Sequence, residues 1–145
     1  GLIPRITTLR ESFDLESSTL YQRAVAEYLG RGRLEAHLAA LSGAHGARCA
    51  TMLGALDAHL SDIARWSRPQ GGVFLWVSLP DGLDTTEMFN QAIQKKVAYI
   101  PGGAFSVHGS TRNALRLNFS NVRPEAIREG VARLSEVIRG ALGSL

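Results

Sequence analysis

The stretch ALRLNFS, residues 114–120, alternates between apolar and polar side chains. Successive side chains of a β-strand point to opposite faces, so Leu115, Leu117 and Phe119 would share one face. Arg116 and its polar neighbours would lie on the other. The alternation predicts a strand with one buried face and one polar face.

Upstream of this stretch, the sequence predicts two more strands with a helix between them. Residues 73–79 (VFLWVSL) are rich in β-branched and aromatic side chains and are bounded by glycines and by a Pro-Asp-Gly turn. The motif DTTE at 84–87 matches a capping box with Asp in the first position, and predicts a helix that runs to Lys96. Residues 97–100 (VAYI) are predicted as a strand that ends at Pro101.

Amphipathic helices are predicted on both sides of these strands. Apolar residues recur at helical spacing over residues 19–29, over residues 34–60, and again from Pro124 to Leu142. The second of these helices is long enough to connect two lobes of a larger molecule. We therefore expect an α+β fold in which a small sheet is covered by helices on one face and preceded by a long helix.

Composition narrows the class of protein. The chain has 145 residues, 45% of them apolar, which is typical of a soluble globular domain with a core of its own. Cys49 is the only cysteine, which favours a reducing, cytoplasmic setting. The longest apolar run has about five residues where a membrane span needs about 20. The first residue is Gly and not Met, so we expect a fragment of a longer protein.

The distribution of charged residues, histidines and cysteine argues against two further functions. The net charge is +3, but the 14 arginines and 2 lysines are interleaved with acids, which argues against nucleic-acid binding by this segment. The four histidines lack short paired spacing and there is no CxxC motif, so no metal site is expected. The glycine pairs at 71–72 and 102–103 open no predicted helix and are interpreted as turns and not as phosphate loops.

Arg116 is the candidate functional residue. A guanidinium on the polar face of a strand is always charged and offers two parallel donors, which suit a carboxylate. The alternative is an edge-strand arginine in solvent. The pattern alone does not decide between these two interpretations.

Four ordered motifs together resemble the C-terminal, small domain of fold-type I, pyridoxal-phosphate-dependent aminotransferases. The resemblance is to the class I/II subgroup with 2-aminoadipate, kynurenine and aromatic aminotransferases. The motifs are GGVFLWV at 71–77, DTTE at 84–87, VAYIPGGAF at 97–105 and LRLNFSN at 115–121, and residues 14–22 are similar to the segment before the interdomain helix. The resemblance implies that residues 1–32 form the edge of a large domain, 33–62 an interdomain helix, and 63–145 the small α+β domain.

The resemblance also implies a function. Such enzymes move an amino group from an L-amino acid to a 2-oxo acid, use pyridoxal phosphate, and are homodimers. Arg116 occupies the position that binds the substrate carboxylate, and Phe74 matches an aromatic residue that lines the substrate pocket in some members. Core packing is the alternative role for Phe74. Which substrate side chain is preferred is left open.

One departure from the family limits what this chain can do alone. The Schiff-base lysine and the other cofactor-binding residues of the family lie upstream, and the only lysines here, Lys95 and Lys96, end a predicted helix. We therefore expect no catalytic and no cofactor-binding residue in this chain, and no activity from it alone. Two other functions stay open: the aminotransferase-like effector domain of a winged-helix transcription regulator, and a ferredoxin-like binding or oligomerisation module.

Overall fold

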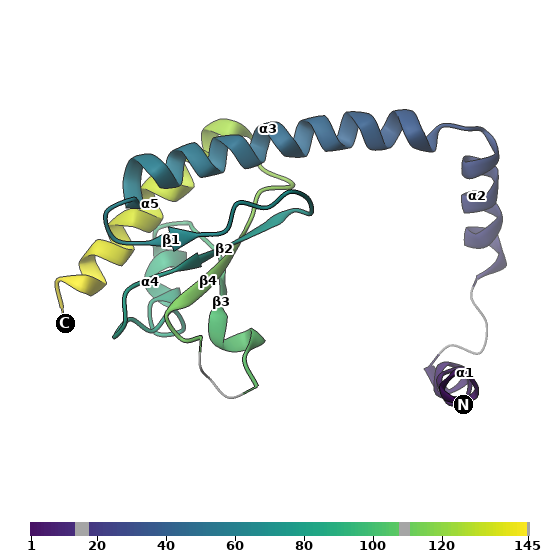
Figure 1. Ribbon diagram of the computed structural model, residues 1–145, viewed down its shortest axis with the longest axis horizontal. Coiled ribbons are helices and arrows are strands. Elements are labelled where there is room, and N and C mark those ends of the chain that lie inside the picture. The colour runs from purple at the N-terminus through teal and green to yellow at the C-terminus, as the bar shows by residue number, and fades with distance from the viewer. Residues whose placement is uncertain (14–17, 108–110, 145) are drawn as a thin grey trace. The chain divides into compact units, whose positions relative to one another are not determined.

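The computed structural model describes residues 1–13, 18–107 and 111–144 (Figure 1). His108 and residues 14–17, which belong to the segment 14–22 named above, lie outside the described residues. The chain divides into two units, Gly1–Ser42 and Gly43–Leu145. The described strands and the buried core all belong to the second unit.

The first unit is helical. It contains α1 (Leu2–Phe13), α2 (Thr19–Gly30) and the beginning of α3 (Leu34–Leu60). The sequence predicted α2 and α3 closely but not α1. Gly32, between α2 and α3, has a φ of 63°, a left-handed conformation that glycine adopts without steric cost. Neither α1 nor α2 contains a buried residue.

Helix α3 continues into the second unit, where its last turns enter the core. Its predicted bounds are confirmed, although three glycines lie within it. The helix contributes four buried residues, all in its C-terminal third: Met52, Ala55, Leu56 and Leu60. The apolar stripe predicted along the whole helix is therefore buried at one end only.

The sheet has four antiparallel strands in the order β1-β2-β4-β3. They are β1 (Arg65–Trp66), β2 (Phe74–Ser78), β4 (Ala114–Asn118) and β3 (Ile100–Pro101). Strands β2 and β4 were predicted, whereas the two-residue β1 was not. The register places Trp76 opposite Arg116 on one side and Ile100 opposite it on the other.

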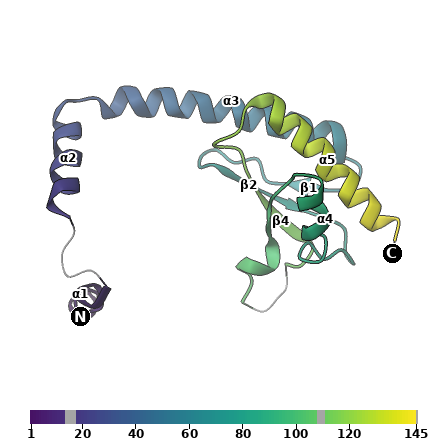
Figure 2. The same ribbon diagram turned by 180° about the vertical axis from the view of Figure 1, so that it is seen from behind.

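Helices cover one face of this sheet, as expected. Helix α5 (Pro124–Leu142) has the bounds that the sequence predicted, and with α4 (Phe89–Gln94) it lies in front of the sheet in Figure 2. One hydrophobic cluster joins both helices and the end of α3 to the inward side chains of β2 and β4. Leu115, Leu117 and Phe119 are buried in it, so the predicted alternation of faces is confirmed.

The segment between β2 and β3 differs from the prediction. Residues 84–87 form a turn in which Asp84 Oδ1 accepts a hydrogen bond from the Thr86 backbone N–H at 2.8 Å, so α4 begins only at Phe89. Lys96 ends that helix with a φ of 60°, and the Val97 N–H donates back to the Ala92 carbonyl. Val97 thus belongs to a helix-terminating turn and not to a strand.

The strand predicted at 97–100 is reduced to Ile100 and Pro101. Pro101 lies within the strand instead of ending it, and the glycines after it open the 3₁₀ helix η1 (Gly102–Phe105). This short helix brings Phe105 to the site described below. None of the helices in the described part of the chain is long and apolar enough to cross a membrane.

Candidate functional site

Arg116 lies in the middle of β4, on the sheet face opposite the helices. Its cross-strand neighbours on that face are Trp76 and Ile100. Strand β4 is an inner strand, between β2 and β3, and Arg116 is half-buried. The alternative of an edge-strand arginine in solvent is therefore wrong.

Two aromatic rings contact the guanidinium. The Cζ atom of Arg116 lies 4.0 Å from the centroid of the Phe74 ring and 4.4 Å from that of the Phe105 ring. Phe74 pairs with Asn118 and is thus a diagonal neighbour of Arg116. Phe74 is 41% exposed, so the alternative of core packing is wrong for this residue.

Within the described residues, no polar group pairs with the Arg116 guanidinium. Its Nε atom is buried and has no hydrogen-bond partner, and no side chain of the described residues forms an ion pair with Arg116. A buried donor without an acceptor is costly and uncommon in native structures, and it often marks the place of a ligand. The geometry suits an anion that approaches the open face of the sheet.

A close backbone contact fixes η1, which carries Phe105. The Thr111 hydroxyl donates to the Gly102 carbonyl at 2.8 Å. A Cβ atom on Gly102 would lie 2.7 Å from the Ala114 carbonyl oxygen and closer still to that of Thr111. Only glycine fits here without displacing the backbone that leads into β4.

Thr85 also fixes the start of β4. Its buried hydroxyl lies 2.7 Å from the Ala114 carbonyl oxygen and 2.9 Å from that of Arg112. Tyr99 donates its phenolic hydrogen to the Thr85 carbonyl at 2.7 Å. Burial, with a smaller contribution from the negative charge of Asp84, raises the pKa of Tyr99 to about 12.

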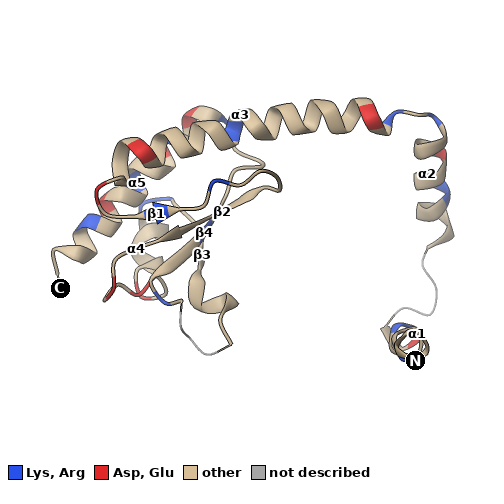
Figure 3. Ribbon diagram, viewed as in Figure 1, with Lys and Arg blue, Asp and Glu red and all other residues tan. Residues whose placement is uncertain are grey.

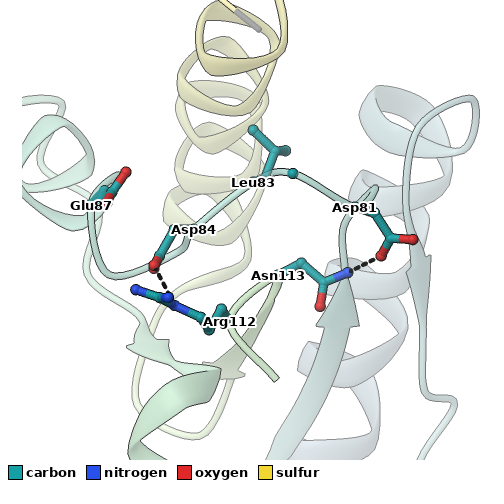
Figure 4. Close-up of a pocket in the computed structure, with 7 residues that line it drawn as sticks. Asp81, Leu83, Asp84, Glu87, Arg112 and Asn113 are labelled. Carbon is teal, nitrogen blue, oxygen red and sulfur yellow. Dashed lines mark hydrogen bonds and ion pairs between the residues drawn. The ribbon is translucent and has the colours of Figure 1, made fainter. Parts of the chain in front are cut away.

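A polar pocket of about 400 Å³ lies beside these turns and does not include Arg116 (Figure 4). Arg112 donates to Asp84 at 2.8 Å, and Asn113 donates to Asp81 at 3.1 Å. Burial works to raise the pKa of Asp84, but the Thr86 N–H and the Arg112 guanidinium together lower it. These internal bonds give the pocket a structural role, and no group of three or more His, Cys, Asp or Glu among the described residues is placed to hold a metal.

The two lysines lie on the helical side of the unit. Lys95 caps the C-terminus of α4, and its Nζ atom pairs with Glu136 of α5 at 2.9 Å, with both side chains more than half exposed. Lys96 is exposed and occupies the left-handed position after it. Basic and acidic residues are interspersed along the other helices (Figure 3).

Sequence reasoning missed two aromatic residues of the site. Trp76 shares a strand face with Phe74, so the period of two in β2 could have identified it. It contacts Phe105 edge-on, with ring centroids 5.4 Å apart and an interplanar angle of 72°. Phe105 lies outside the sheet, so no periodic signal in the sequence could have placed it beside Arg116.

Comparison with known proteins gives the family. The profile of the family described as aminotransferase class I and II matches residues 6–134. An aromatic-amino-acid aminotransferase of Thermococcus litoralis is 39% identical over 94% of this chain and 33% of its own length. Matches at lower identity include an uncharacterised HTH-type transcriptional regulator of Bacillus subtilis, YisV, with 29% identity over 95% of this chain and 28% of that protein.

Solved structures agree in fold. A multiple substrate aminotransferase from Thermococcus profundus superposes with a TM-score of 0.92 and 38% identity, over 99% of this chain and 36% of that one. The α-aminoadipate aminotransferase from Thermus thermophilus, solved with N-(5'-phosphopyridoxyl)-L-leucine, superposes with a TM-score of 0.91 and 32% identity. The match covers 99% of this chain and 37% of that one. The chain spans about a third of the length of the curated relatives it matches. It belongs to the class I and II aminotransferase family.

Proposed function

We propose that this chain is part of a pyridoxal-phosphate-dependent aminotransferase, in which Arg116 binds the carboxylate of the amino-acid or 2-oxo-acid substrate. The observation that carries the proposal is the half-buried guanidinium with an unpaired Nε, contacted by two rings on an open sheet face. The family and the names of the relatives support the reaction class.

Arg116 would bind and orient the substrate. Two parallel N–H donors fit the two oxygens of a carboxylate, and the bidentate geometry fixes both the position and the rotation of the bound acid. Holding a substrate in this way lowers the entropic part of the reaction barrier. Phe74, which lies against the guanidinium, would form the adjacent wall of the substrate pocket.

The cofactor would be held by residues outside this chain. Pyridoxal phosphate supplies an electron sink for amino transfer when bound. An attachment lysine needs a desolvated setting that lowers its pKa, whereas Lys95 is exposed and paired with Glu136 on the helical side of the sheet. The residues described here therefore do not fit the cofactor, and we propose that this chain alone is inactive.

The remaining parts of the proposal concern organisation. We propose that residues 1–32 belong to the edge of a larger domain, residues 33–62 form the helix between domains, and residues 63–145 form the small domain. We also propose that the full-length protein is a homodimer and is located in the cytoplasm.

A second candidate function has one observation in its favour, the match to HTH-type regulators at lower identity. In such a protein Arg116 would bind the carboxylate of an effector and not of a reacting substrate. Sequence-specific DNA binding by the full-length protein, with no transamination of any amino acid, would favour the regulator.

The test of the first proposal is Arg116→Ala in the full-length protein. We expect the kcat/KM for every amino donor to fall at least about a hundredfold, since a charge-assisted bidentate contact is lost. Arg112→Ala is the matched control, because Arg112 is an exposed arginine paired with Asp84 away from the site. A loss below about tenfold for Arg116→Ala would remove this residue from the substrate site.

A further inference from the structure

We propose that Phe105, held in place by Trp76, is a positioning residue that sets the orientation of the Arg116 guanidinium for carboxylate binding. This inference rests on the proposed function of Arg116. Phe105 and Trp76 are uncharged and would not bind the substrate carboxylate as Arg116 does. Their effect would pass through Arg116.

The first argument is geometric. An arginine side chain has several rotatable bonds, and a guanidinium without polar partners has nothing but packing to hold it. Here the centroids of the Phe74 and Phe105 rings lie 4.0 and 4.4 Å from the Cζ atom of Arg116. Phe74 comes from the neighbouring strand β2, and Phe105 comes from η1, so two independent elements restrict the same group.

The second argument concerns how Phe105 is itself fixed. The ring of Trp76 meets it edge-on at 5.4 Å, and Trp76 is directly opposite Arg116 in the sheet. The three residues therefore lie next to one another: Trp76 is beside Arg116 in the sheet, and the Phe105 ring contacts both. The backbone of η1 is fixed in turn by Gly102, whose carbonyl accepts the Thr111 hydroxyl.

The third argument is electrostatic. Aromatic faces attract a cation without accepting its hydrogen bonds. The rings therefore compensate part of the cost of the buried, unpaired Nε atom and leave the N–H donors of the guanidinium for a ligand. A carboxylate or amide side chain in place of the Phe105 ring would compete with the incoming carboxylate for these donors. The Phe105 ring attracts the guanidinium and offers no such acceptor.

The experiment uses the full-length, cofactor-loaded protein and two carboxylates that cannot react, 4-methylpentanoate and 3-phenylpropanoate. Their competitive inhibition constants report carboxylate binding without amino transfer. For Phe105→Leu we expect the inhibition constants and the KM for amino donors to rise roughly fivefold, the size of a lost cation–π contact, with kcat within about twofold. Phe105→Tyr should restore wild-type values, and Trp76→Leu should weaken binding in the same direction.

The chain provides a matched control. Phe89 and Tyr99 form another edge-on pair with centroids 5.4 Å apart, on the helical side of the sheet. Phe89→Leu removes a ring from an equivalent pair and should leave the inhibition constants unchanged. If Phe105→Leu behaves like Phe89→Leu, or if Phe105→Tyr fails to restore binding, the inference is wrong.

Failure of the inference can be separated from failure of the proposed function. If Arg116→Ala leaves the inhibition constants unchanged, Arg116 is not the carboxylate site and both proposals fail. If Arg116→Ala weakens both carboxylates and Phe105→Leu does not, only the positioning role fails. Should Phe105→Leu not fold, Phe105→Met supplies the same loss of the ring with a flexible side chain of similar volume, and the same increase in the inhibition constants is expected.

Discussion

The hydroxyl of Thr85 lies 2.7 Å from the backbone carbonyl oxygen of Ala114, two residues before Arg116. This bond joins the turn before α4 to the first residue of β4. The same carbonyl is one of the two that a side chain at Gly102 would strike. The start of the arginine strand is therefore contacted by two loops, one that carries Thr85 and one that carries Gly102.

Thr85→Val is expected to destabilise the second unit by about 1–3 kcal/mol. Valine has the same shape but leaves the buried Ala114 carbonyl without its hydroxyl donor. Unfolding in urea, followed by circular dichroism, measures the change. Thr51→Val is the control, since the Thr51 hydroxyl bonds a carbonyl of its own helix near the surface. Equal losses for the two variants would contradict the special role of Thr85.

Gly102→Ala is expected to cost about 2 kcal/mol or more, because the added Cβ would overlap two backbone carbonyls that cannot move independently of β4. Gly103→Ala is the neighbouring control, since its Cβ would meet only the Thr86 side chain, at 3.8 Å. The difference between the urea unfolding midpoints of the two variants measures the cost of placing a Cβ atom against the Thr111 and Ala114 carbonyl oxygens. If they are equally stable, the contact at Gly102 is not as tight as described.

The sequence predicted the faces of β4 but not the partners of Arg116. Alternation is a local property, and it placed Leu117 inward and Arg116 outward correctly. Phe105 reaches the guanidinium through a 3₁₀ turn whose first residue, Gly102, is held by the Thr111 hydroxyl nine residues later. Such a contact leaves no periodic signal. The pairing of Arg116 with both Trp76 and Ile100 likewise depends on strand order, which local patterns do not determine.

The sequence-based predictions were wrong at both ends of α4, and a local turn lies at each end. Val97 is β-branched and precedes other apolar residues, which favours a strand, but its N–H donates to the Ala92 carbonyl in the turn that ends α4. That turn needs a residue in the left-handed conformation, and Lys96 occupies this position. A glycine there would have indicated the end of the helix from the sequence, but a lysine does not. At the other end, the Asp84 side chain accepts the Thr86 N–H as an N-cap residue would, but residues 85–88 form a turn and the helix begins only at Phe89.

Stability is expected to fall as the pH rises from about 10 towards 12, in part through Tyr99. Its pKa is raised to about 12 in the folded protein, against about 10 in an unfolded chain, so the folded state binds this proton more tightly. The resulting stabilisation is complete below pH 10 and is lost as the pH approaches 12. Tyr99→Phe lacks the proton, so the difference in unfolding free energy between wild type and variant should shrink between pH 9 and 11.5. A constant difference would contradict the raised pKa.

Pyridoxal phosphate is expected to form no specific adduct with this chain alone. The amino group of Lys95 is exposed and paired with Glu136 at 2.9 Å, and that hydrogen bond is the chief cause that lowers the pKa of Glu136. This exposed setting lacks the desolvated pocket that an attachment lysine needs. Titration followed between roughly 390 and 430 nm, borohydride reduction and peptide mass analysis test this. Lys95→Arg keeps the charge and serves as control, because any weak labelling of Lys96 should persist in it. A stoichiometric adduct at either lysine would mean that this chain carries its own attachment site, and would overturn the proposal that the cofactor is held by residues outside it.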